Sequence, residues 1–279
     1  MANRSYPSLL LHLELGQPNT GLLRAAAEIA AQFESRVVGM VLCQPLPVGY
    51  GEGYVDFELI EQNRKDIARE VSETQVQFRA ALTAQALALE WRSAVLGTSL
   101  VDELAAEART ADLILSTQPS GDSVDASRHV SPGELVLQAG RPVLLVPRAL
   151  SRMRLQHVLV AWQDTRESRR AVADSLPLLQ WAGQVSVVEI APDGGLKAAR
   201  TRVSDVASWL LAHGVLADPV AVATEGDATA TQLKNIAQEL RAELIVAGAY
   251  GHSRLRQWAL GGVTRDLLMQ AECCTLLSH

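Results

Sequence analysis

Residues 242–247 read Ala-Glu-Leu-Ile-Val-Ala, and residues 111–116 read Ala-Asp-Leu-Ile-Leu-Ser. Ala242 follows Ala111 by 131 residues, which is close to half of the 279-residue chain. An internal similarity at a fixed spacing is typical of a duplicated structural unit. We therefore expect the chain to contain two copies of one domain.

The elements around these two segments follow the same order in each half. An apolar run opens each half, an amphipathic helical pattern follows it, and further apolar runs alternate with helical patterns. The opening runs lie at 8–13 and 157–161, the next strands at 36–42 and 185–190, the longer helices at 56–87 and 196–213, and the final runs at 142–146 and 275–277. This alternation predicts βαβ units and a parallel sheet with helices on both faces. The basic segment 147–154 is the predicted linker, so we expect domains at 1–147 and 155–279.

A glycine-spaced loop follows the repeated strand of the second half. Gly248, Gly251, Gly261 and Gly262 occupy the stretch between this strand and a helical pattern that begins at Val263. In an open parallel sheet, ligands bind outside the carboxyl ends of the strands. Free amide groups at a helix N-terminus attract phosphate. The loop lacks the Gly-Lys-Ser/Thr of a P-loop and does not follow the first strand as a dinucleotide fingerprint does.

The spacing Gly248-x2-Gly251-x9-Gly261 resembles the ATP-binding motif of the universal stress protein family, which is Gly-x2-Gly-x9-Gly-Ser/Thr. The order of elements in both halves is similar to that family as well. The resemblance implies two tandem Rossmann-like domains of the adenine nucleotide alpha-hydrolase-like class. Each would hold a five-stranded parallel sheet of strand order 3-2-1-4-5. It also implies that Val143–Val146 and Thr275–Leu277 pair within the chain as a pseudo-dimer, with a further homodimer left open.

The resemblance implies one adenine nucleotide site, for ATP, ADP or AMP, in the second half. Its predicted residues are Ala161, Gln163, Gly248, Gly251, Gly261, Gly262 and Val263. Two positions depart from the family pattern, because Gln163 replaces an Asp and Gly262 replaces the Ser or Thr. The first half has lost the motif: at the same offset it has Thr117, Ser120 and Val130. We expect this half to be a degenerate domain that acts as a scaffold.

Composition limits the classes of function that remain. A formal charge of −6 disfavours binding to nucleic acid and to anionic membranes. Cys43, Cys273 and Cys274 form no disulfide pattern and indicate a reduced, cytoplasmic compartment. The six histidines show no metal-ligand spacing, and the adjacent His252 and Ser253 do not form a catalytic pair, so we expect no metal site and no catalytic residues.

Three functions remain at this point. The leading hypothesis is a stress-response regulatory protein that binds an adenine nucleotide in its second domain, together with protein partners that the sequence does not identify. The second is an interaction scaffold of the same fold that binds no nucleotide. The third is an enzyme of the related nucleotide-hydrolase architecture, with at most weak ATP hydrolysis.

Overall fold

The computed structural model describes residues 5–45, 57–119, 127–224, 229–249 and 273–279. The first half contains β1 (Ser8–Leu13), α1 (Thr20–Phe33), β2 (Arg36–Cys43), α2 (Phe57–Leu82), β3 (Ala88–Val95), α3 (Leu100–Glu107), the 3-10 helix η1 (Ala108–Thr110), β4 (Leu113–Thr117), α4 (Pro132–Gln138) and β5 (Val143–Val146). The second half contains β6 (His157–Ala161), α5 (Arg166–Trp181), β7 (Gln184–Ala191), the 3-10 helix η2 (Asp193–Gly195), α6 (Leu196–Ala212), β8 (Ala217–Ala223), α7 (Thr229–Glu239), β9 (Leu244–Gly248) and β10 (Cys274–Ser278).

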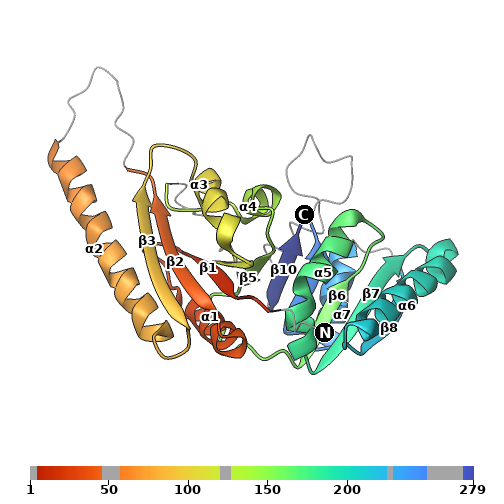
Figure 1. The fold of residues 1–279 in the computed structure, drawn as a ribbon. Helices are drawn as coiled ribbons and strands as arrows, with labels where there is room; N and C mark the ends of the chain where they lie inside the picture. The colour runs from red at the N-terminus through yellow and green to blue at the C-terminus, as the bar shows by residue number, and fades with distance from the viewer. Residues whose placement is uncertain (1–4, 46–56, 120–126, 225–228, 250–272) are drawn as a thin grey trace, which may run out of the picture.

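All ten of these strands form one sheet, in the order β3-β2-β1-β4-β5-β10-β9-β6-β7-β8. Each half therefore has the predicted strand order 3-2-1-4-5. Neighbouring strands are parallel except β5 and β10, which meet at the centre of the molecule and run antiparallel (Figure 1). Thr275, Leu276 and Leu277 pair with Leu145, Leu144 and Val143, respectively. The predicted pairing of the two final strands within one chain is thus confirmed.

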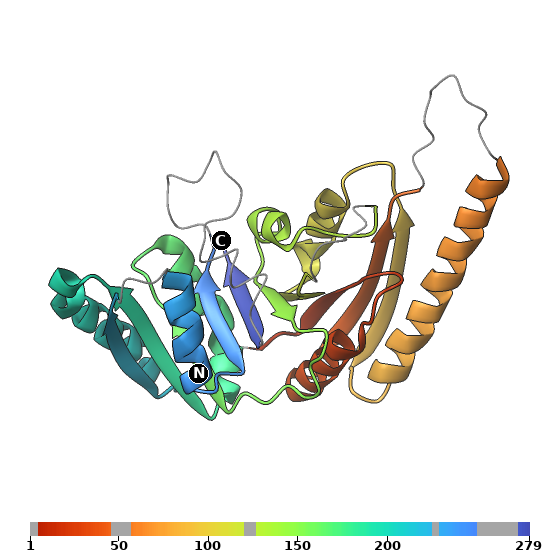
Figure 2. The same cartoon turned by 180° about the vertical axis from the view of Figure 1, so that it is seen from behind.

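Helices cover both faces of the sheet, which explains why the central strands are continuous apolar runs. One buried cluster joins α1, α2, α5 and α6 to one face, and a second joins α3, α4 and α7 to the other. The side chains of β1 alternate between them: Leu9 and Leu11 belong to the first cluster and Leu10 to the second. The view from behind brings α7 to the front and turns α5 away (Figure 2).

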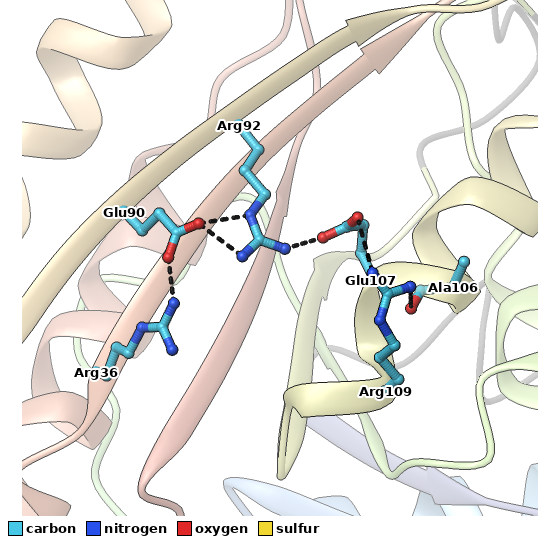
Figure 3. Close-up of polar contacts among 6 residues, drawn as sticks. All are labelled: Arg36, Glu90, Arg92, Ala106, Glu107 and Arg109. Atoms are coloured by element: carbon cyan, nitrogen blue, oxygen red, sulfur yellow. Dashed lines mark hydrogen bonds and ion pairs between the residues drawn. The ribbon is translucent and has the colours of Figure 1, made fainter.

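The outer strands β3 and β8 resist further pairing by different means. The strand β8 contains Pro219, which lacks an amide donor and is tolerated on an edge strand. In the other half, Glu90 and Arg92 of β3 join Arg36, Glu107 and Arg109 in a chain of ion pairs (Figure 3). Arg92 Nε donates to Glu90 Oε1 at 2.7 Å. The hydrogen bonds that Glu90 accepts, first from Arg92 and then from Arg36, lower the pKa of its carboxyl group.

The long polar helix predicted over 56–87 ends earlier than expected. α2 stops at Leu82, whose carbonyl accepts from the amides of Gln85 and Ala86, both at 3.0 Å. The chain turns at this point, and the Leu87 amide donates to the Ser35 carbonyl. The strand β3 begins at the next residue. No helix in the described residues is both long and apolar enough to cross a membrane.

Candidate functional site

The carboxyl ends of β6 and β9 lie side by side in the second half. Ala161 pairs in register with Ala247, and Gly248 is the last residue of β9. β6 is also flanked by β7 on its other side. The strand order reverses at β6, and such a switch point is where open α/β sheets bind their ligands. The structure thus brings Ala161, Gln163 and Gly248 to the same end of neighbouring strands.

Gly248 lies against the first turn of α5. A Cβ at this position would be 2.5 Å from the carbonyl carbon of Glu167 and closer still to the amide nitrogen of Ser168. Real Cβ atoms do not approach a backbone so closely, so no other residue fits without a shift of the helix or the strand. From the sequence, this glycine was expected to let a ligand approach the backbone. The structure gives it a second role, because the absence of a side chain at Gly248 allows β9 to pack directly against α5.

The first turn of α5 faces the same end of the sheet. Thr165 caps the helix by accepting a hydrogen bond from the Ser168 amide at 3.3 Å. Gln163, two residues before the cap, is exposed, and its carbonyl accepts from the Thr165 amide at 2.7 Å. Burial alone would raise the pKa of Glu167, but hydrogen bonds, first that from Arg166, bring it below its ordinary value. An exposed amide side chain therefore lies beside a capped helix N-terminus.

Four of the predicted nucleotide-binding residues lie outside the described residues: Gly251, Gly261, Gly262 and Val263. The start of their loop is fixed by β10, because the Ala249 amide donates to the Ser278 carbonyl at 2.9 Å. In the described residues no group of three or more His, Cys, Asp or Glu side chains is arranged to hold a metal ion. Cys43, Cys273 and Cys274 form no disulfide bond with one another or with any other described residue.

The strand registers identify the equivalent place in the first half. Leu9 of β1 pairs with Leu113, as Val158 of β6 pairs with Leu244. Five residues further along each strand, Glu14 therefore corresponds to Gln163. By the same register His12 corresponds to Ala161, Ser116 to Ala247 and Thr117 to Gly248.

A buried polar cluster fills this place in the first half. The Glu14 carboxylate, only 5% exposed, forms an ion pair with Arg148 and bonds to His129 Nδ1 at 3.1 Å. His12, fully buried, shares a hydrogen bond of 3.1 Å with Ser116 Oγ. The Asn19 side chain holds the backbone of Glu14 on both sides, with distances of 3.1 and 2.9 Å. Side chains of the chain itself thus occupy the end of β1.

Two pKa shifts follow from this burial. Burial would raise the pKa of Glu14, but hydrogen bonds from His129 and Arg148 lower it to about 2. Burial also lowers the pKa of His12 to about 4, so that its ring is neutral at pH 7. The cluster therefore contains a carboxylate held charged and a histidine held neutral.

This cluster was not predicted from the sequence, because Glu14 is 115 residues from His129 and 134 residues from Arg148 along the chain. One signal was present, since a carboxylate that ends an apolar strand needs a partner if it is buried. The strand register, which identifies the partner, comes only from the structure.

Comparison with known proteins identifies the second half. The model of the universal stress protein family matches residues 154–279. These residues belong to the universal stress protein family. No curated protein matches the chain. The match covers the part of the chain that includes β6, β9 and β10, and with them the glycine-spaced loop.

Solved structures extend the similarity in fold to the whole chain. A universal stress protein from Archaeoglobus fulgidus is 11% identical, with 98% of each chain covered and a TM-score of 0.73. A protein of unknown function from Pseudomonas aeruginosa is 18% identical, with 98% of this chain and 92% of that chain covered and a TM-score of 0.60. A universal stress protein from Archaeoglobus fulgidus in complex with dAMP is 20% identical and covers 45% of this chain and 98% of that chain, with a TM-score of 0.37. The first of these matches, which covers 98% of both chains, shows that the tandem α/β fold is that of a universal stress protein.

Proposed function

We propose that this chain is a cytoplasmic stress-response regulatory protein that binds ATP, or a related adenine nucleotide, in its second domain. The observation that carries the proposal is the juxtaposition of Gln163 and Gly248 at the switch point of the half that matches the family. The exposed Gln163 amide offers both a donor and an acceptor to adenine or ribose. The glycine spacing from Gly248 to Gly261 supports phosphate binding by backbone amides.

We further propose the domain division 1–147 and 155–279, with one nucleotide site per chain. The first domain would be a scaffold, because Glu14 and its partners occupy the place that corresponds to Gln163. The residues proposed to contact nucleotide are Ala161, Gln163, Gly248, Gly251, Gly261, Gly262 and Val263.

A second candidate is an interaction scaffold that binds no nucleotide. The observation in its favour is that the contact between Gly248 and α5 already requires a glycine, whether or not a ligand approaches. The two candidates differ in one measurable quantity, which is the affinity of the intact chain for adenine nucleotides.

Calorimetric titration of the purified chain with ATP, ADP and AMP tests the proposal. We expect one site per chain, and ligand at a hundredfold excess over its Kd should stabilise the fold by about 2.7 kcal/mol. Gly251→Asp should abolish binding by placing a negative charge in the loop, whereas Ser120→Asp, at the same offset in the first half, should leave it unchanged. No heat with any of the three nucleotides, together with none released on denaturation, would favour the scaffold.

A further inference from the structure

A cavity of about 350 Å³ lies between α5 and α6, and none of its lining residues is among those proposed to contact nucleotide. It is lined by Trp162, Arg169, Val172, Asp205, Val206 and Trp209. Its volume lies within the range of small-molecule pockets. The two helices belong to the face of the sheet opposite α7, and the lining includes neither Gln163 nor Gly248.

Two tryptophan residues, Trp162 and Trp209, line the cavity. Trp162 follows β6, whereas Trp209 shares one side of α6 with Asp205 and Val206, at helical spacing. The indoles make no ring contact with each other in the described chain. Trp209 instead lies on the His213 ring, with centroids 4.1 Å apart. The two tryptophan rings therefore do not cover each other by stacking.

The lining of the cavity carries one positive and one negative side chain, Arg169 and Asp205, and they differ in their partners. Arg169 is paired with Asp164, at 2.5 Å. Asp205 is exposed, and its side chain has no ion pair or hydrogen bond to any described residue. Aromatic ring faces attract cations, and the attraction strengthens as the cation loses water. An unpaired carboxylate beside two indoles is thus complementary to a positive charge carried on an apolar body.

We infer that the cavity between α5 and α6 binds a small organic cation, with its ammonium group near Asp205 and its flat apolar part against Trp162 and Trp209. This site shares no lining residue with the proposed nucleotide site, although Trp162 lies between Ala161 and Gln163 in the sequence. The two sites also differ in chemistry, because a nucleotide brings negative charge. The inference therefore does not rest on the proposed function. The two tryptophans supply the apolar surface, and Asp205 selects the sign of the charge.

Three probes of one shape and different charge test the inference on the intact chain. They are 2-phenylethylammonium, 2-phenylethanol and phenylacetate, which share an aromatic ring and a short side chain. By calorimetric titration we expect the cation to bind about 3- to 30-fold more tightly than the alcohol. Phenylacetate should bind most weakly of the three. Equal affinities for all three probes, or no binding of the cation at millimolar concentration, would overturn the inference.

Substitutions at exposed positions separate the site from general effects on the fold. Asp205→Asn should remove the preference for the cation, and Trp209→Ala should weaken binding of both the cation and the alcohol. Leu211→Ala on the same helix and Glu239→Gln on α7 are the matched controls, and both should bind as the parent chain does. Gly251→Asp, which tests the nucleotide loop, should leave cation binding unchanged. Equal losses in the site variants and the controls would refute the assignment.

Discussion

The same strand end carries opposite chemistry in the two halves of the sheet. In the first half, Glu14 is buried and held by Arg148 and His129, whereas Gln163 at the equivalent place in the second half is exposed. His12 and Ser116 form a buried hydrogen bond where the second half has Ala161 and Ala247. The strand order and the register of these strands are the same in both halves. The same strand end therefore holds a buried, ion-paired carboxylate in one half and an exposed amide residue in the other.

The largest expected effect comes from breaking the Glu14 ion pair. Glu14→Gln leaves Arg148 largely buried without its counter-charge, and removal of one partner of a buried pair costs about 3–5 kcal/mol. The reverse change, Gln163→Glu, is made at an exposed position and should alter stability by less than about 0.5 kcal/mol. Urea unfolding of both variants measures the difference. Similar losses at the two positions would contradict the contrast between a buried and an exposed strand end.

Acid should weaken the first half before the second, because of His12. Its pKa falls from 6.5 to about 4 on burial, so the stability it contributes is complete above pH 6.5 and is lost as pH drops toward 4. This loss is about 3 kcal/mol. Glu14, with a pKa lowered to about 2, adds a loss that begins near pH 4.5 and continues down to 2.

His12→Ala gives the first half the alanine that the second half has at Ala161, so it should flatten the pH dependence of unfolding between pH 6.5 and 4. Hydrogen exchange at pH 5 should show earlier opening of β1 than of β6 in the parent chain and a smaller gap in the variant. An unchanged slope in His12→Ala would mean that another group titrates.

Gly248 and Thr117 offer a matched test of strand–helix contact. Gly248→Ala places a Cβ against the backbone of α5 and should destabilise the chain by about 1–3 kcal/mol. Thr117→Ala removes a buried hydroxyl that has no partner among the described residues, so its effect should stay below about 1 kcal/mol. Thermal unfolding of the two variants gives the comparison. A tolerated alanine at Gly248 would show that β9 and α5 can separate.

The smallest effect is expected at the edge strands. Arg92→Ala breaks the ion-pair chain of β3 and should cost at most about 1 kcal/mol, because these side chains are partly exposed. The loss should shrink in 1 M salt, which screens exposed charges. Gln184→Ala, which removes a hydrogen bond of 3.2 Å to Asp218 on the opposite edge, is the control and should be less sensitive to salt. Equal salt dependence would assign the effect to packing.

Most of the fold follows from local patterns, whereas the site does not. The repeat at residues 111–116 and 242–247 and the alternation of strand and helix predict the parallel sheet of each half, and the family resemblance supplies the strand order and the pairing of β5 with β10. The contact of Gly248 with α5 could not be predicted, because a glycine after a strand is equally consistent with ligand approach and with packing. The Glu14 cluster could not be predicted because its members are joined only through the register of the sheet.

The two strands that pair at the antiparallel junction, β5 and β10, are synthesised at different times. Val146 leaves the ribosome 128 residues ahead of Cys274. At typical translation rates this interval lasts roughly 6 to 26 seconds. Throughout it, the nascent first half presents an apolar strand edge whose eventual partner has not yet been made, and such edges readily pair with other chains. A nascent chain of this architecture is therefore exposed to pairing with other chains until β10 has been synthesised and can cover the edge of β5.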